Sequence, residues 1–179
     1  ENIGKRFLNQ SFDPQNQYSI PYFWGTLGIV YNTELVKTAP KHWSDLWRPE
    51  YKNSIMMIDG AREVMGVGLN ALGYSLNSKN TKQLQEAVDK LYTLTPNIKA
   101  IVADEMKGYM IQNNAAIGVS FSGEARQMLE KNDKLRYVVP TEASNLWFDN
   151  IVIPKTVKNK KAAYQFINFM LKPENAYKN

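Results

Sequence analysis

The sequence predicts an α/β fold built around a largely parallel sheet. Short runs rich in β-branched and aromatic residues alternate with amphipathic segments of ten or more residues, which is the pattern of strand–helix–strand units. With 179 residues, of which 44% are hydrophobic, the chain is long enough for one ordinary domain or for parts of two. No run approaches the about 20 consecutive apolar residues of a membrane span.

The first half of the chain is expected to contain an irregular polar start, a long extended segment, a helical turn, a short strand and a helix. In that order they lie at residues 1–17, 18–32, 42–51, 54–59 and around 64–72. Pro21 limits regular strand pairing at its position. Gly73 is expected to end the helix, because glycine is the residue that most often follows a last helical turn.

Strands and helices continue to alternate in the second half. Helices are expected from Thr81 to before Pro96, at 104–113, at 123–131 and at 160–171, and strands at 98–102, 115–121, 135–139 and 146–153. Ser122 and Asn159 are candidate N-caps of the last two helices, since their side chains can accept from the free N–H groups of a first turn. Pro173 is expected to end the last helix.

The charge pattern argues against nucleic acid as a partner. The net charge is +5 and the isoelectric point is about 9.2, but the basic residues are scattered. The densest basic run begins the predicted helix at 160–171, where such residues usually form a solvated face. Cysteine is absent, which excludes disulfides and thiol chemistry. We therefore expect no nucleic-acid interface.

Catalytic constellations are also mostly missing. His42 is the single histidine, so no metal site of His and Cys ligands is expected. The segment around Ser120 does not match the G-x-S-x-G turn of hydrolases, and no phosphate-binding loop is present. Asp104 and Glu105 are adjacent and diverge on a helix, so they make a poor acid–base pair. We expect no enzyme and no cofactor; a hydrolytic enzyme is the less favoured alternative.

The remaining candidate residues are acidic and aromatic side chains at the ends of predicted strands. Asp149 lies within the apolar run "NLWFDNIVIP", where a buried carboxylate would need a cation or several donors. One interpretation is a salt bridge or a turn cap, and the other is a cation from outside. Asp59, Glu63 and Phe121 also follow or end predicted strands, and Trp147 shares a face with Asp149. Each alone fits core packing or a helix dipole, but together they suit an organic ammonium ligand outside the carboxyl ends of the strands.

Four motifs carry a family resemblance. "YSIPYFWGTLGIVYN", "WSDLWRPEYKNSI", "DGAREVMGVGLNALGYS" and "NLWFDNIVIPKTVKNKKAAYQFINFMLKPENA" resemble, in this order, the spermidine/putrescine-binding proteins of bacterial ABC importers. The similarity runs from about residue 10 to the end of the chain. The resemblance implies a class II periplasmic-binding-protein-like fold, in which two lobes close around a polyamine that is then delivered to membrane permease subunits.

The resemblance also implies that this chain is part of a longer protein. Residues 1–22 would be a first-lobe or hinge segment, 23–147 the second lobe, and 148–179 a hinge strand and first-lobe helix, with hinge motion near 22–26 and 148–152. The implied location is extracytoplasmic, in the periplasm or at the cell surface through a lipidated N-terminus outside this chain. The main alternative is a solute-binding protein of the same fold that binds a different small molecule. A further alternative is that the partial chain by itself binds no ligand tightly.

When the family's site is carried over residue by residue, the carboxylates that would bind the polyamine fall on Glu63 and Asp149. A further family aspartate falls on Gly60, with Asp59 one position earlier, which bears on the choice between a diamine and a triamine. The stacking tryptophan falls on Trp147, and a second falls on Phe121, a smaller ring. The resemblance gives Trp24 a place at the hinge rather than on the ligand.

Overall fold

Two compact units make up the structure. The computed structural model describes residues 2–178, and the chain divides into one unit of residues 25–146 and one of residues 1–24 with 147–179. The chain therefore crosses from unit to unit twice, at Trp24–Gly25 and at Leu146–Trp147. We call residues 25–146 the core unit and the remainder the flanking unit.

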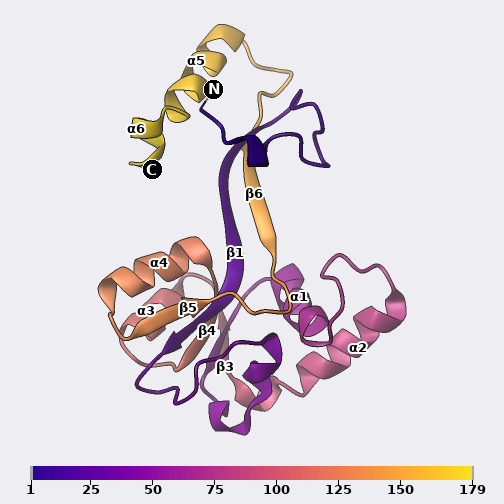
Figure 1. Ribbon diagram of the computed structural model, residues 1–179, viewed down its shortest axis with the longest axis vertical. Helices are drawn as coiled ribbons and strands as arrows, with labels where there is room; N and C mark the ends of the chain where they lie inside the picture. The colour runs from indigo at the N-terminus through magenta and orange to yellow at the C-terminus, as the bar shows by residue number, and fades with distance from the viewer. Residues whose placement is uncertain (1, 179) are drawn as a thin grey trace. The chain divides into compact units, whose positions relative to one another are not determined.

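The described residues form strands and helices close to those expected (Figure 1). The strands are β1 (Ile20–Asn32), β2 (Ile55–Ile58), β3 (Ile98–Val102), β4 (Ile117–Phe121), β5 (Leu135–Val138) and β6 (Leu146–Ile151). The α-helices are α1 (Ala61–Ala71), α2 (Thr81–Tyr92), α3 (Glu105–Ile111), α4 (Ser122–Lys131), α5 (Lys160–Met170) and α6 (Pro173–Ala176). Short 3₁₀ helices cover Lys5–Phe7, Trp43–Trp47, Pro49–Tyr51 and Thr95–Asn97.

The sheet is mixed, and the expectation of a largely parallel sheet is wrong for β1. The strand order is β3-β2-β4-β1-β5, with β6 paired to β1. β2 runs parallel to β3 and β4, whereas β1 runs antiparallel to β4 and β5. β1 comes into the core unit from the flanking unit rather than through a crossover helix, so nothing forces it into the parallel direction.

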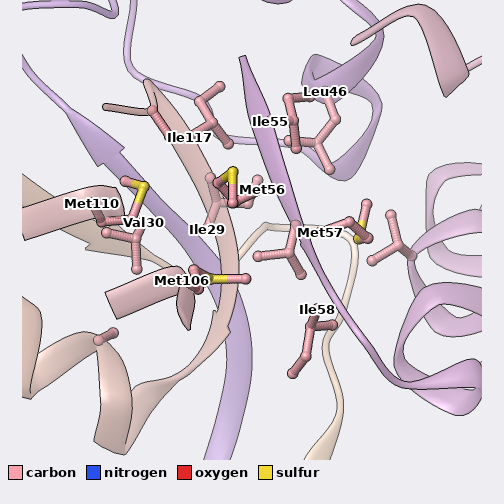
Figure 2. Packing of buried hydrophobic residues seen from close by; sticks show 14 of the residues in the cluster. Ile29, Val30, Leu46, Ile55, Met56, Met57, Ile58, Met106, Met110 and Ile117 are labelled. Carbon is pink, nitrogen blue, oxygen red and sulfur yellow. The ribbon is translucent and has the colours of Figure 1, made fainter. Parts of the chain in front are cut away.

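Helices cover both faces of this sheet in the core unit. Met56 pairs with Gly118, and a Cβ at Gly118 would lie 3.1 Å from Met106 Sδ and 3.3 Å from Met110 Sδ, so α3 packs on that face. Figure 2 shows these methionines with Val30 and Ile29 among the buried side chains. Alternation along β2 turns Met57 to the opposite face, where α1 and α2 pack. Figure 1 shows α3 and α4 on one side of the sheet and α1 and α2 on the other.

Helix ends follow the predicted signals except at one position. Gly73 has φ +75° just after α1, and Asn80 and Asn159 accept hydrogen bonds from the first turns of α2 and α5. Ser122, expected as an N-cap, instead is the first residue of α4, and Phe121 occupies the cap position. The hydroxyl of Ser122 accepts from the backbone N–H of Thr26 on β1 at 3.2 Å, so a tertiary contact replaced the local one. α5 ends at Met170, before Pro173, which begins α6.

The flanking unit has a smaller set of packed side chains. Phe7 lies against Trp24 and Phe148, with ring centroids 5.5 and 6.2 Å apart, and the Arg6 guanidinium lies 4.6 Å from the centroid of the Phe7 ring. Buried Asp13 accepts hydrogen bonds from the backbone of residues 17–19 and closes the loop before β1. No helix within residues 2–178 is both long and apolar enough to cross a bilayer.

Candidate ligand-binding site

The carboxyl ends of β2, β3 and β4 lie at one edge of the sheet because these strands run in the same direction. The backbone N–H of Asp59, just past β2, donates to the Val102 carbonyl at 2.9 Å, which holds the strand ends together. α1 starts two residues after Asp59, with Gly60 as N-cap and Glu63 in the first turn. Phe121 ends β4. The structure therefore brings Asp59, Gly60, Glu63 and Phe121 to one edge of the core unit.

Two of the acidic side chains at this edge, Asp59 and Glu63, have no partner among the described residues. Asp59 is exposed and Glu63 is half-buried, and neither takes part in any ion pair or side-chain hydrogen bond among residues 2–178. Glu124, in the first turn of α4, differs: its carboxylate accepts from Ser120 at 3.2 Å and lies 4.0 Å from Lys107 Nζ. Asp59 and Glu63 therefore remain available to an external cation, as does Glu105, which begins α3 after β3, is exposed and forms no ion pair among residues 2–178.

Phe121 is held by the strands around it. It pairs with Leu27 in the antiparallel register of β4 and β1, and its half-buried ring packs against the hydrophobic core. The next residue, Ser122, is tied to Thr26, and the Tyr137 hydroxyl donates to the Thr26 carbonyl at 3.0 Å. The sequence does not predict these hydrogen bonds among Thr26, Ser122 and Tyr137. Thr26 and Tyr137 are 111 positions apart, and no local pattern indicates that they meet.

The remaining predicted residues belong to the flanking unit. Trp147 and Asp149 are two positions apart on β6, so they share a face of that strand. Trp147 is half-buried, but Asp149 is exposed, and it forms no ion pair or hydrogen bond with residues 2–178. The expectation of a buried, costly carboxylate is thus wrong: Asp149 is exposed, although Trp147 and Ile151 on the same face of β6 are half-buried. The carboxylate is solvated, and its availability to a cation does not depend on burial.

Two other titratable groups, His42 and Asp45, hold the local fold. His42 lies 2.9 Å from Thr141 Oγ1 and 3.5 Å from the Glu142 carboxylate. Burial opposes ionisation of Asp45, yet hydrogen bonds from the backbone of Lys41 and His42 and the charge of Arg48 hold the pKa of Asp45 below its ordinary value. Within residues 2–178 no group of three or more His, Cys, Asp and Glu side chains is placed to hold a metal ion.

Solved structures place this fold among the periplasmic binding proteins. The chain is 79% identical to the PotD spermidine/putrescine ABC transporter substrate-binding protein of Streptococcus pneumoniae, with a TM-score of 0.91 over 99% of this chain and 55% of that one. It is 28% identical to the TpPotD lipoprotein of Treponema pallidum, with a TM-score of 0.85 over 92% of this chain and 53% of that one. The fold class is therefore that of a periplasmic binding protein, as the sequence predicted.

The chain belongs to the family of bacterial extracellular solute-binding proteins, which it matches over residues 1–177. Among curated relatives, it is 38% identical over 177 residues to the spermidine/putrescine-binding periplasmic protein of Salmonella typhimurium, covering 98% of this chain and 51% of the relative. The chain thus spans about half the length of the curated relatives it matches. The predicted resemblance to spermidine/putrescine-binding proteins is confirmed.

Proposed function

We propose that this chain is part of the polyamine-binding component of an ABC importer for spermidine or putrescine. The observation that carries the proposal is that the Asp59 and Glu63 carboxylates, which have no cationic partner among residues 2–178, lie at the same edge of the sheet as the half-buried Phe121 ring. Unpaired acids of this kind suit a ligand that brings its own ammonium groups. The names of the relatives support the same ligand class.

Each proposed residue has a distinct role. Glu63 and Asp149 accept the N–H donors of ammonium groups, with Asp59 as a further acid beside Glu63. The rings of Trp147 and Phe121 lie along the methylene chain and attract the cationic ends through their π-faces. In the whole protein, two lobes close on the ligand by a hinge motion, as other two-lobed binding proteins do.

The partners, the location and the lobe assignment of the protein follow from this role. The loaded protein delivers its ligand to the permease subunits of the importer and carries out no chemistry on it. Its location is extracytoplasmic, in agreement with the periplasmic relatives. We assign the core unit to the second lobe and the flanking unit to the hinge and first lobe, the rest of the first lobe being supplied by the half of the relatives' length that this chain does not span.

A different solute is the rival hypothesis, and the charges at the sheet edge discriminate against one class. An anion binder would place lysine or arginine at the starts of α1 and α4, where helix dipoles also attract anions. Instead, Glu63 and Glu124 occupy these first turns, and the guanidinium of Arg62, which shares the first turn of α1, donates to Asn77 Oδ1 at 2.9 Å. Acids at both helix starts favour a cationic solute.

Isothermal titration calorimetry with spermidine tests the proposal on the full-length protein, meaning this chain together with the segment that completes its relatives. Asp149→Asn should weaken spermidine binding by about 2–5 kcal/mol, because the ligand's ammonium group loses its partner. Asp133→Asn is the matched control: Asp133 is exposed, and its carboxylate forms no ion pair or hydrogen bond among residues 2–178, so this variant should bind as the unmodified protein does.

Two results would contradict the proposal. An unmodified full-length protein that binds neither spermidine nor putrescine rejects the ligand class, and an unchanged affinity for Asp149→Asn rejects the residue assignment. Thermal-shift measurements on the 179-residue chain alone, with the same two polyamines, complete the test. Shifts that occur only in the full-length protein support a site that needs both lobes.

A further inference from the structure

One buried polar side chain of the described chain has no partner. The buried polar or charged residues among residues 2–178 are Asp13, Asn32, Asn70, Asn97, Ser120 and Asn132. All of their side chains except that of Asn70 form hydrogen bonds. The Asn70 amide forms none with the described residues, although Asn70 is only 4% exposed. Because an unpaired buried amide costs free energy, its surroundings need an explanation.

The Asn70 side chain faces a pocket of about 400 Å³ in the core unit. The pocket lies between residues 70–77, at the end of α1 and in the loop after it, and residues 142–144, which precede β6. The Asn70 amide is not among the unpartnered polar atoms that are sealed from solvent, so its remaining accessible surface opens into this pocket. None of Asp59, Glu63 and Phe121 lines it, so the pocket is separate from the sheet edge.

The groups that line this pocket favour a ligand that donates hydrogen bonds. Glu142 is the one charged residue among residues 2–178 that lines it, and its carboxylate accepts from the Trp43 backbone N–H at 3.1 Å. The Ser144 hydroxyl donates to the Leu27 carbonyl, so towards a ligand it can only accept. With Asn70 Oδ1, the pocket therefore offers three kinds of oxygen acceptor.

The charge of Glu142 is not neutralised by a lysine or arginine. No such residue among residues 2–178 forms an ion pair with it. The Arg62 guanidinium donates to Asn77 Oδ1 at 2.9 Å and does not line the pocket. His42 Nδ1 lies 3.5 Å from the carboxylate, but an imidazole carries a charge only when it is protonated. The carboxylate can therefore accept from a cation that a ligand supplies.

We propose that this pocket is a binding site for a small primary alkylammonium ion. Such an ion has three N–H donors and no acceptor, and it donates to the Glu142 carboxylate, to Asn70 Oδ1 and to the Ser144 hydroxyl. The volume of the pocket leaves room for a short alkyl chain beside the ammonium group, against the side chains of Leu76 and Ala143. The inference goes beyond the proposed function and does not depend on it, because the two sites share no residue.

Nuclear magnetic resonance of the full-length protein tests the site directly. On titration with n-butylammonium chloride, the side-chain N–H signals of Asn70 and the backbone N–H signals of Gly73 and Ala143 should shift and saturate at millimolar concentrations. Tetramethylammonium chloride is the matched control at equal ionic strength. It carries the same charge but has no N–H donor, so it should leave these three sets of signals in place.

Two substitutions assign the binding to the named side chains. Asn70→Leu keeps the volume and removes the amide, so affinity for n-butylammonium, followed through the Gly73 signal, should fall about tenfold or more. Its melting temperature should stay or rise, because a buried amide without an internal partner is lost; a merely structural role would lower it. Glu142→Gln keeps an acceptor for the Trp43 N–H, removes the charge and should also weaken binding about tenfold or more. Glu50→Gln, at an exposed acid outside the pocket, is the control and should change nothing.

Several results would overturn the inference. Equal shifts with tetramethylammonium mean that only the ionic atmosphere acts on these signals. No shift with n-butylammonium means that the Asn70 amide meets ordered water and no ligand. Unchanged affinity in both Asn70→Leu and Glu142→Gln places the ion elsewhere. Failure of the full-length protein to bind spermidine rejects the proposed function and leaves this site untouched, so the two failures are distinguishable.

Discussion

The Tyr137 hydroxyl on β5 donates a hydrogen bond of 3.0 Å to the carbonyl of Thr26 on β1, and Thr26 Oγ1 lies 3.1 Å from the same hydroxyl. Gly28 makes room for the ring, because a Cβ there would lie 2.5 Å from Tyr137 Cζ. Burial raises the pKa of Tyr137, so the phenol stays protonated and remains a donor at neutral pH. The start of the core-unit part of β1 is thus fixed to two other elements, β5 and, through Ser122, α4.

Removing the Tyr137 hydroxyl should loosen this anchor. We expect Tyr137→Phe to lower the free energy of unfolding by about 0.5–2 kcal/mol, since the Thr26 carbonyl loses a donor. Urea denaturation monitored by circular dichroism measures the change. Tyr92→Phe is the control. Because Tyr92 is 73% exposed, loss of its hydroxyl should alter the free energy of unfolding by less than about 0.5 kcal/mol. Equal stability of the two variants would mean that the Tyr137–Thr26 bond contributes nothing.

The Asp13 loop should depend on pH. Burial opposes ionisation of Asp13, but hydrogen bonds from Tyr18, Gln17 and Ser19 outweigh it and hold the pKa of Asp13 below its ordinary value of 3.8. A lowered pKa in the folded state means that the unfolded chain binds the proton more tightly. The stabilisation is therefore present above about pH 4 and is lost as pH falls through the folded-state pKa.

Asp13→Asn tests this sign. The variant should be less stable than the unmodified protein at about pH 6, and the difference should shrink as the pH falls towards about 3, with stability measured by urea unfolding at each pH. Asp45 also has a lowered pKa, but it is present in both proteins, so its contribution cancels in the difference. A difference that stays constant over this pH range would contradict a role for the ionised carboxylate.

Phe121→Leu should weaken polyamine binding while the fold is retained. Leucine keeps an apolar side chain against the core, so the stability loss should be below about 1.5 kcal/mol. The lost π-face should cost about 0.5–2 kcal/mol of spermidine affinity in calorimetry on the full-length protein. Phe169→Leu, on α5 with a ring that is 54% exposed, is the matched control and should bind as the unmodified protein does. If Phe121→Leu and Phe169→Leu bind spermidine with the same affinity, Phe121 does not contact the ligand.

Helices and strands were predictable where the signals are local. The apolar spacing and Gly73 located α1, the Asn80 and Asn159 side chains cap α2 and α5, and the short apolar runs became β2 and β4. In each case the energy that decides the element comes from residues within one or two turns. Asp59, Glu63 and Phe121 could be placed at one edge for a similar reason, because parallel strands end together.

Contacts between distant segments were not predictable. Asn32 and Asn132 both donate to Asn113 Oδ1, at 2.6 and 2.9 Å, and this hub joins the end of β1 to the segments that follow α3 and α4. Nothing in the neighbourhood of any one of these asparagines indicates the other two. The antiparallel direction of β1 has the same origin, since strand direction depends on where the chain comes from and not on the residues of the strand.

The sequence by itself determined the α/β class, the order of the elements, the resemblance to polyamine-binding proteins and which acids and rings are candidates for the ligand. Only the tertiary structure decided that Asp149 is exposed, that Ser122 bonds to Thr26 instead of capping α4, and that the buried amide of Asn70 faces a pocket. The division has a physical reason. Periodicity and capping are properties of neighbouring residues, whereas exposure, anchoring and the surroundings of a buried amide depend on which atoms packing brings together from far along the chain.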